Sequence, residues 1–177
     1  ANAEVVHYNI LQGLTKIEQD GKTSPLLAEN WHTSADQQVW RFSLRRNVQF
    51  HDGSPFDAST VRWCFERAQQ ANSGNKGQNA LFDNVSAIET PDPHTVVLQL
   101  HHPDPHLLFR LGESYAVILH PKTAATAHSQ PIGTGPYRFE RWQRGQSIHL
   151  KRFTGYWGPA PALKRASFHF LDATQLE

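Results

Sequence analysis

Apolar and polar residues alternate along residues 39–45, VWRFSLR, so that Trp40, Phe42 and Leu44 fall on one side of an extended chain. A period of two is typical of a strand with one buried face. Three further strands are predicted near the end of the chain, over 137–142, 147–152 and 166–171. The first two flank a turn at Arg144-Gly145, which indicates a hairpin.

The period lengthens to three or four positions after residue 57, as expected for an amphipathic helix. Its predicted apolar face comprises Val61, Cys64, Phe65 and Ala68. Asp57 precedes this face, and we expect its carboxylate to cap the helix by accepting from the amide of Thr60. The segment after the helix, 70–80, is polar and rich in Gly and Asn, which predicts a loop.

The other segments are assigned from breaker residues and short apolar runs. They are a helix over 4–12 stopped by Gly13, a turn at Asp20-Gly21, a strand from 47 into a turn at Asp52-Gly53, strands on both sides of a turn at 91–93, a helix within 105–113, a buried strand over 115–121 and a short helix after Pro121. Because the strands cluster as hairpins, we expect an α+β fold with a mainly antiparallel sheet.

The length and composition of the chain exclude several classes of protein. The 177 residues suffice for one compact domain. Seventeen basic and 16 acidic residues nearly balance, and the basic residues are scattered along the chain, so no nucleic-acid partner is expected. A single cysteine excludes a disulfide within the chain. No apolar run approaches the roughly 20 residues of a membrane helix. Because Met is absent, we expect a mature or cut form that lacks its signal peptide.

The stretch HDGS at 51–54 brings together a His, an Asp and a Ser. A serine nucleophile needs a base within hydrogen-bond reach and an oxyanion site, and adjacent side chains in a turn diverge. Asp52-Gly53 is better explained as a tight turn between a strand and the helix that Asp57 caps. We therefore predict no catalytic residue here.

Two other groups carry reactive side chains. His101, His102 and His106 lie around Asp104 and form the densest histidine group, a weak candidate for zinc or nickel. The intervening prolines oppose convergence of these side chains, so a solvated loop is favoured, and no metal or cofactor is predicted. Cys64 lies on the apolar helix face and is interpreted as a buried, inert thiol.

The stretch PIGTGPY at 131–137 has glycines at 133 and 135, which we expect to adopt backbone angles closed to other residues. A Gly-rich loop that binds phosphate normally leads into a helix, whereas a strand follows here. A structural crossover between subdomains is therefore favoured over a phosphate site.

Four stretches, in this order, resemble a known family. They are LLAENW (26–31), VWRFSLRRNVQFHDGSPFDASTVRWCFERA (39–68), PDPHTVVLQL (91–100) and PIGTGPYRFERWQRGQSIHLKRFTGYWG (131–158). They are similar to hallmark motifs of the family 5 bacterial extracellular solute-binding proteins, which are the dipeptide, oligopeptide and nickel receptors of ABC importers. The last stretch is the most specific, and the resemblance extends over nearly the whole chain.

The resemblance implies a periplasmic-binding-protein type II-like fold, of which this chain is a fragment of the first lobe. Residues 1–14 would be a first-lobe segment, 15–130 the extra subdomain of that lobe, and 131–177 the return to the lobe, with the second lobe absent. The implied function is a periplasmic receptor, not an enzyme. It would capture a peptide or similar small solute and deliver it to the permease subunits of an ABC importer in the membrane.

Site residues follow only weakly from the resemblance. Ala1, Asn2 and Ala3 would enter near the cleft, and the segment that holds Asn79 and Phe82 would approach it from the subdomain. Two alternatives stay open at this point. The same fold serves as the solute-sensing domain of winged-helix transcription regulators, and His101, His102 and His106 would be required for a metal-dependent enzyme.

Overall fold

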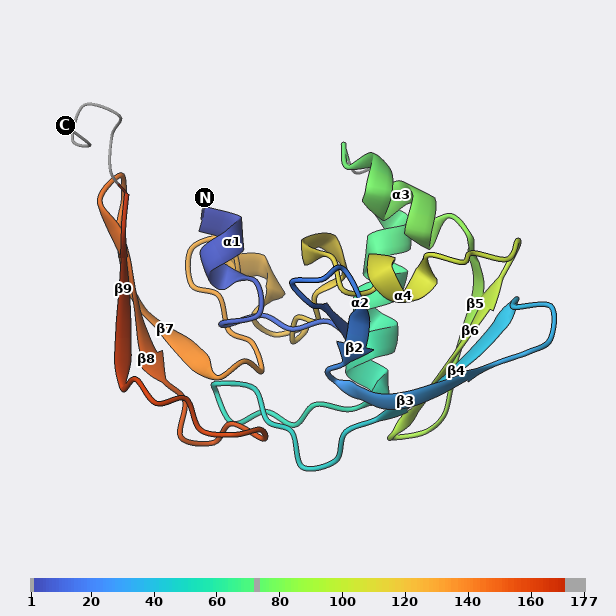
Figure 1. The fold of residues 1–177 in the computed structure, drawn as a ribbon, viewed down its shortest axis with the longest axis horizontal. Helices are drawn as coiled ribbons and strands as arrows, with labels where there is room; N and C mark the ends of the chain where they lie inside the picture. The colour runs from blue at the N-terminus through green and yellow to red at the C-terminus, as the bar shows by residue number, and fades with distance from the viewer. Residues whose placement is uncertain (1, 72–73, 171–177) are drawn as a thin grey trace.

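The computed structural model describes residues 2–71 and 74–170, with Asn2 and Ala3 as backbone alone. These residues form three antiparallel sheets with helices between them (Figure 1). Within the described part of the chain, no helix combines the length and apolar character needed to cross a membrane.

The central sheet has the strand order β3-β4-β6-β5. Its strands are β3 (Ala28–Thr33), β4 (Val39–Leu44), β5 (Val85–Asp92) and β6 (Thr95–Leu100). The predicted alternation in β4 is confirmed, because Trp40, Phe42 and Leu44 are all buried. The hairpin of β5 and β6 is also confirmed. The helix α2 (Ala58–Gln70) packs across these two strands, so the main hydrophobic core lies between sheet and helix.

Two polar side chains set where the helices begin. The Asp57 carboxylate accepts from the amides of Ser59 and Thr60, at 2.9 and 3.1 Å, and confirms the predicted start of α2. Asn75 caps a second helix, α3 (Lys76–Phe82), by accepting from the amides at 77 and 78. The prediction of a loop over 70–80 is therefore wrong from residue 76, because this cap starts a helix whose buried face is limited to its last turn.

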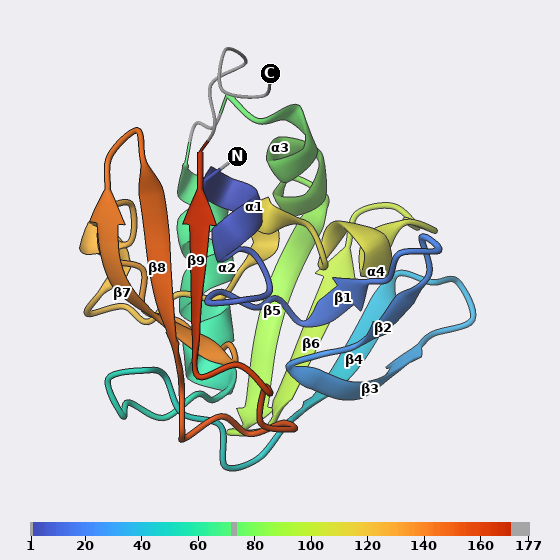
Figure 2. The same ribbon diagram turned by 60° about the vertical axis from the view of Figure 1, so that its left-hand side comes forward.

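The third sheet has the order β7-β8-β9, with β7 (Tyr137–Gln143), β8 (Ser147–Arg152) and β9 (Arg165–His169). The three predicted strands are confirmed, and the turn residue Gly145 has a φ of 75°. The helix α1 (Asn2–Val6) lies on the inner side of this sheet (Figures 1 and 2). Ile10, Ile148 and Leu150 form the centre of a second, smaller hydrophobic core there.

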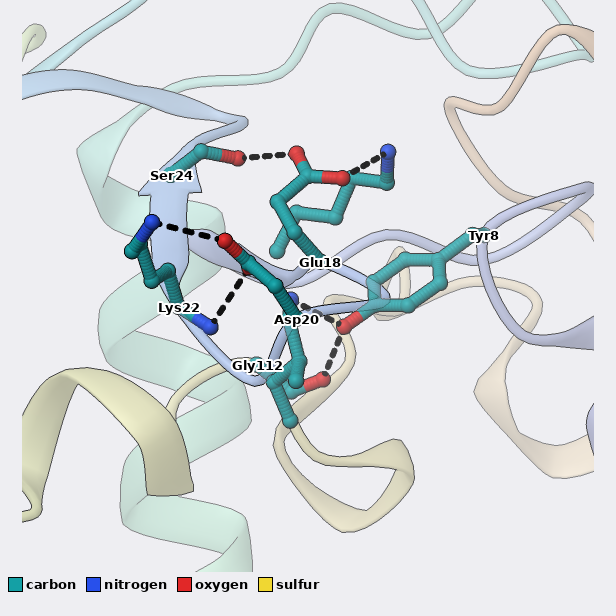
Figure 3. A network of polar contacts seen from close by, with 8 residues as sticks. Tyr8, Glu18, Asp20, Lys22, Ser24 and Gly112 are labelled. Atoms are coloured by element: carbon teal, nitrogen blue, oxygen red, sulfur yellow. Dashed lines mark hydrogen bonds and ion pairs between the residues drawn. The ribbon is translucent and has the colours of Figure 1, made fainter.

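A small hairpin of β1 (Thr15–Ile17) and β2 (Thr23–Pro25) connects the two regions. Figure 3 shows the contacts around it. The Tyr8 hydroxyl donates to the carbonyl of Gly112, at 2.7 Å, and accepts from the amide of Ile17, at 2.8 Å. Glu18 accepts from Ser24 at 2.6 Å. The remaining elements are α4 (Leu107–Arg110), η1 (Ser114–Ala116) and η2 (Ala124–Thr126).

The prediction of a helix over 4–12 is wrong beyond Val6. Tyr8 has a φ of 64°, which ends the helical path. The carbonyls at 9 and 10 accept instead from the amides of Tyr137 and Gly135, both at 2.9 Å. Gly13 is therefore no helix cap. These carbonyls bond to a loop over 120 residues away in sequence, which local patterns do not reveal.

Two predicted strands are absent from the described residues. Val48 and Phe50 are buried, but the backbone at 47–56 bonds mainly within its own turn and makes one isolated bridge, Gln49 to Pro55. Residues 115–121 begin in η1 and continue without a ladder. Single hydrogen bonds hold this segment instead. The amide of Ile118 donates to the carbonyl of residue 12, and the Cys64 side chain bonds to the backbone of Leu119.

Candidate functional site

An open pocket of about 290 Å³ lies where the C-terminal half of α2 meets α3 and the segment after η1. Its lining combines apolar and polar side chains: Cys64, Arg67, Ala68, Ala71, Gln78, Ser114, Tyr115, Val117 and Leu119. A concave surface with an apolar base and a few polar groups is the usual form of a small-molecule site.

The amphipathic sequence of α2 forms one wall of this pocket. Val61 and Phe65 turn into the core, which leaves the next side of the helix, with Cys64 and Ala68, half-buried along the pocket. The opposite wall depends on Gly77, because a Cβ there would lie 3.0 Å from the ring of Tyr115. The absence of a side chain at 77 lets Tyr115 pack against α3.

Cys64 holds the segment after η1, which forms the third wall of the pocket, against α2. Its thiol donates to the carbonyl of Leu119, at 3.0 Å, and accepts from the amide of the same residue, at 3.1 Å. Burial raises the pKa of Cys64 to about 11, so the group stays a neutral thiol at pH 7. A neutral thiol is a poor nucleophile, and these contacts give Cys64 a structural role.

The polar side chains that line the pocket are suited to binding a small solute. Arg67 is exposed, and its guanidinium lies 5.5 Å from the ring centre of Trp63. Gln78 and Ser114 add amide and hydroxyl groups to the lining. Burial raises the pKa of Tyr115, which keeps its hydroxyl protonated. Together they provide one fixed cation and several neutral hydrogen-bonding groups.

The weak sequence candidates for ligand contact fall in different places. Ala1 and the side chains of Asn2 and Ala3 lie outside the described residues. Phe82 is 2% exposed and packs on Phe65, so its ring belongs to the core and faces no solute. Asn79 is half-buried on α3 and does not line the pocket, whereas its neighbour Gln78 does.

The histidine group lies in an exposed loop. Asn84 holds its backbone, donating to the carbonyl of His102 at 2.9 Å and accepting from the amide of the same residue at 3.0 Å. The Asp104 carboxylate pairs with Arg110 at 3.0 Å. Over residues 2–71 and 74–170, no three metal-ligating side chains come together, and His101, His102 and His106 form no such group.

His51 has a structural role that the sequence did not reveal. Its Nδ1 accepts from the amide of Gly133, at 3.3 Å, so the proton is on Nε2, which donates to the carbonyl of Gly135 at 2.9 Å. Asp52 accepts from the amide of Ser54 and closes the turn. The HDGS stretch therefore holds the 131–137 loop by one neutral imidazole and by a bond from the amide of His51 to the carbonyl of Gly133, at 2.9 Å.

Burial lowers the pKa of His51 from 6.5 to about 4. Between these pH values the unfolded chain binds a proton that the folded chain excludes. The stabilisation is therefore complete above pH 6.5 and is lost as the pH falls to about 4, by roughly 3 kcal/mol at most. We expect His51→Gln to flatten the pH dependence of the unfolding free energy in this window. Exposed His32→Gln is the control, and an unchanged slope in His51→Gln would contradict the assignment.

A buried amide joins three distant segments near the same loop. The Oε1 of Gln12, a residue 1% exposed, accepts from the hydroxyl of Thr134 at 3.0 Å and from the indole of Trp157 at 3.1 Å. Its Nε2 donates to the hydroxyl of Tyr156 at 3.3 Å. The guanidinium of Arg45 lies 4.3 Å from the centre of the Trp157 ring. Gln12 occurs in no recognisable motif, so sequence reasoning missed it.

The glycines of the 131–137 loop are required for a different reason from the one predicted. Neither has a positive φ. A Cβ at Gly133 would lie 2.0 Å from the carbonyl oxygen of Ile10, and one at Gly135 would lie 2.4 Å from that of Asn9. The loop needs glycine because two backbones approach each other closely.

Each of these contacts involves at least one residue of the stretches at 39–68 and 131–158, which resemble a known family. Residues 22–176 match the family model "Bacterial extracellular solute-binding proteins, family 5 Middle". The chain belongs to this family. It is 31% identical over 159 residues to the glutathione-binding protein GsiB of Salmonella paratyphi A, covering 88% of this chain and 31% of that protein.

Solved structures of family 5 proteins show the same fold. AgaA from A. tumefaciens R10, in complex with agropinic acid, is 32% identical with a TM-score of 0.87, over 97% of this chain and 36% of that one. DppA from Helicobacter pylori, in complex with the peptide STSA, is 26% identical with a TM-score of 0.81, over 92% and 37%. The chain thus has part of a periplasmic-binding-protein type II fold and spans about a third of these relatives.

Proposed function

We propose that the protein carrying this chain is the periplasmic receptor of a bacterial ABC importer. It captures a small peptide-like solute between two lobes and delivers it to the permease, with no bond made or broken. The pocket between α2 and α3 supports this most directly, because it offers hydrogen-bonding groups and a cation on an open surface. An open surface suits a ligand that a second lobe encloses.

The two hydrophobic cores support the proposed organisation of the chain. The main core draws its residues from 14–118, with residues of the later segment packed on its edge. The smaller core combines Val5, Val6 and Ile10 with strands β7 to β9. We therefore propose that 1–14 and 131–177 form one part of the first lobe and that 15–130 form its extra subdomain.

The proposed solute carries a carboxylate. GsiB is named for glutathione, and the related structures contain agropinic acid, the peptide STSA or a nickel–histidine complex. Each of these solutes carries a carboxylate or is built from amino acids that do. Arg67 supplies the complementary guanidinium in the pocket, a group that binds carboxylates with two parallel hydrogen bonds.

Arg67→Gln is expected to weaken solute binding by the intact protein about tenfold to a hundredfold, because a charge-assisted hydrogen bond contributes roughly 1.5–3 kcal/mol. Isothermal titration calorimetry with glutathione, a tetrapeptide and an opine measures this. Arg41→Gln is the matched control, because it removes an exposed arginine from β4, outside the pocket. Equal affinities of the Arg67 and Arg41 variants would contradict the assignment of Arg67.

The proposed location is tested by osmotic-shock fractionation of the native cell. Release of the protein with the periplasmic contents is expected. Retention in the cytosol would contradict the receptor proposal and favour a solute-sensing regulator instead.

A further inference from the structure

The outer face of the β7–β9 sheet gathers basic side chains that are far apart in sequence. The strand register places Arg138 opposite Lys151, and Lys151 opposite Arg165. The next row pairs Arg141 with His149. We call the side of the sheet that holds these five residues the basic face. The side chains of the inner face, such as Ile148 and Leu150, pack instead on the smaller core.

This arrangement is unfavourable for the isolated sheet. Like charges directly opposite each other on neighbouring strands repel and destabilise the pairing. Arg138, Lys151 and Arg165 are all exposed and form a row across the three strands. Glu140 pairs with Arg165 at 3.4 Å, but an exposed pair offsets little of the repulsion. A stable fold needs no such row, which points to an anionic partner.

Charge is strongly segregated along the chain. Residues 137–169 contain seven of the 17 Lys and Arg but one of the 16 Asp and Glu, a net of +6. The remaining residues have a net of −5, which gives the overall +1. Figure 1 shows the sheet edge-on at one end of the molecule, with α1 on its inner side. The charge separation therefore favours approach of that end toward an anionic surface.

The chemistry of the basic face favours lipid headgroups over a protein surface. Protein interfaces are enriched in Arg, but they are depleted in Lys and are centred on buried apolar or aromatic anchors. The large exposed hydrophobic residues of the described chain are Val39 on β4, Phe109 on α4 and Leu163 in the connection between β8 and β9, and none of them lies on a strand of this sheet. Headgroup binding requires only cations that reach the phosphates.

We propose that the basic face binds the anionic phospholipid surface of the membrane that holds the permease. The proposal rests on the proposed function only because that function places the protein beside a membrane. Three cations in a row along β7, β8 and β9 would contact several headgroups at once. Such contacts would keep the receptor near the membrane without insertion, and solute binding would not depend on them.

Co-sedimentation of the intact protein with vesicles tests this proposal. The vesicles contain either 30% phosphatidylglycerol in phosphatidylcholine or phosphatidylcholine alone. The triple variant Arg138→Gln/Lys151→Gln/Arg165→Gln is compared with Arg46→Gln/Lys76→Gln/Lys122→Gln, which removes three exposed charges from other elements. We expect the first variant to lose partitioning onto anionic vesicles on the order of a hundredfold, because each basic residue near such a surface contributes roughly a factor of five.

The control variant is expected to lose less than threefold, and 0.5 M salt should abolish binding of the wild type. Solute affinity, measured in parallel, should be unchanged in the first variant, and its unfolding temperature should stay equal or rise because the cross-strand repulsion is removed. Equal loss in both variants, or equal binding to neutral vesicles, would overturn the proposal. Charge-dependent cross-linking to an acidic membrane protein, without vesicle binding, would overturn it in favour of a protein partner.

Discussion

Gly133→Ala should abolish the native stability of this part of the molecule. The new Cβ would lie 2.0 Å from the carbonyl oxygen of Ile10 and 2.8 Å from its carbonyl carbon. Both atoms belong to the backbone, so no side-chain rotation relieves the clash. Separating the backbones would also break the bond from the amide of Gly135 to the same carbonyl. We expect a loss of about 4 kcal/mol or more in the free energy of unfolding, measured by denaturant titration.

Gly74→Ala provides the matched control for this substitution. No atom beyond the neighbouring residues lies within 4 Å of a Cβ at 74, so the expected change is within about 0.5 kcal/mol. A Gly133→Ala variant as stable as this control would show that the loop is not held against residues 9 and 10.

Gln12→Met is expected to lower the free energy of unfolding by about 3 kcal/mol. Methionine preserves the approximate volume but removes the acceptor that Thr134 and Trp157 share. Thr134 is fully buried, so its hydroxyl has no access to replacement water. Each buried group left without a partner costs about 1–3 kcal/mol.

Two measurements test this expectation. Denaturant titration gives the stability, and a red-shifted tryptophan emission would report displacement of the half-buried Trp157 indole toward water. Gln19→Met is the control, because residue 19 is exposed in the hairpin loop between β1 and β2. Equal stability of the two variants would show that the Gln12 network contributes nothing.

The sequence alone was sufficient to predict the elements that depend on interactions between residues close in the chain. The period of two in β4 and the apolar stripe of α2 reflect burial of one face, and the Asp57 cap acts within three residues. The sequence was insufficient where hydrogen bonds to backbone far away in the chain determine the local conformation. The carbonyls of Asn9 and Ile10 bond to the 135–137 backbone, which ends α1 early and removes the expected helix over 4–12.

The candidate site was predictable only in part. Motif order indicated the segment that holds Asn79 and Phe82, which was expected as a loop and is the helix α3, whose Gln78 lines the pocket. Tyr115 and Arg67 reach the pocket from elements separated by nearly 50 residues. The basic residues were interpreted as scattered, and that interpretation is wrong for the sheet. Strand register brings Arg138, Lys151 and Arg165 into one row, and register across β8 and β9 is set by tertiary packing.

The central claim is that solute is held between this part of the chain and the rest of the protein. Calorimetric titration of the intact protein and of the isolated 1–177 segment with the same panel of glutathione, tetrapeptide and opine tests it most directly. We expect at least one solute to bind the intact protein with a micromolar Kd, and the segment no tighter than about 1 mM, or roughly 4 kcal/mol. Micromolar binding by the segment alone would contradict capture between two lobes, and no binding by the intact protein would contradict the proposed class of solute.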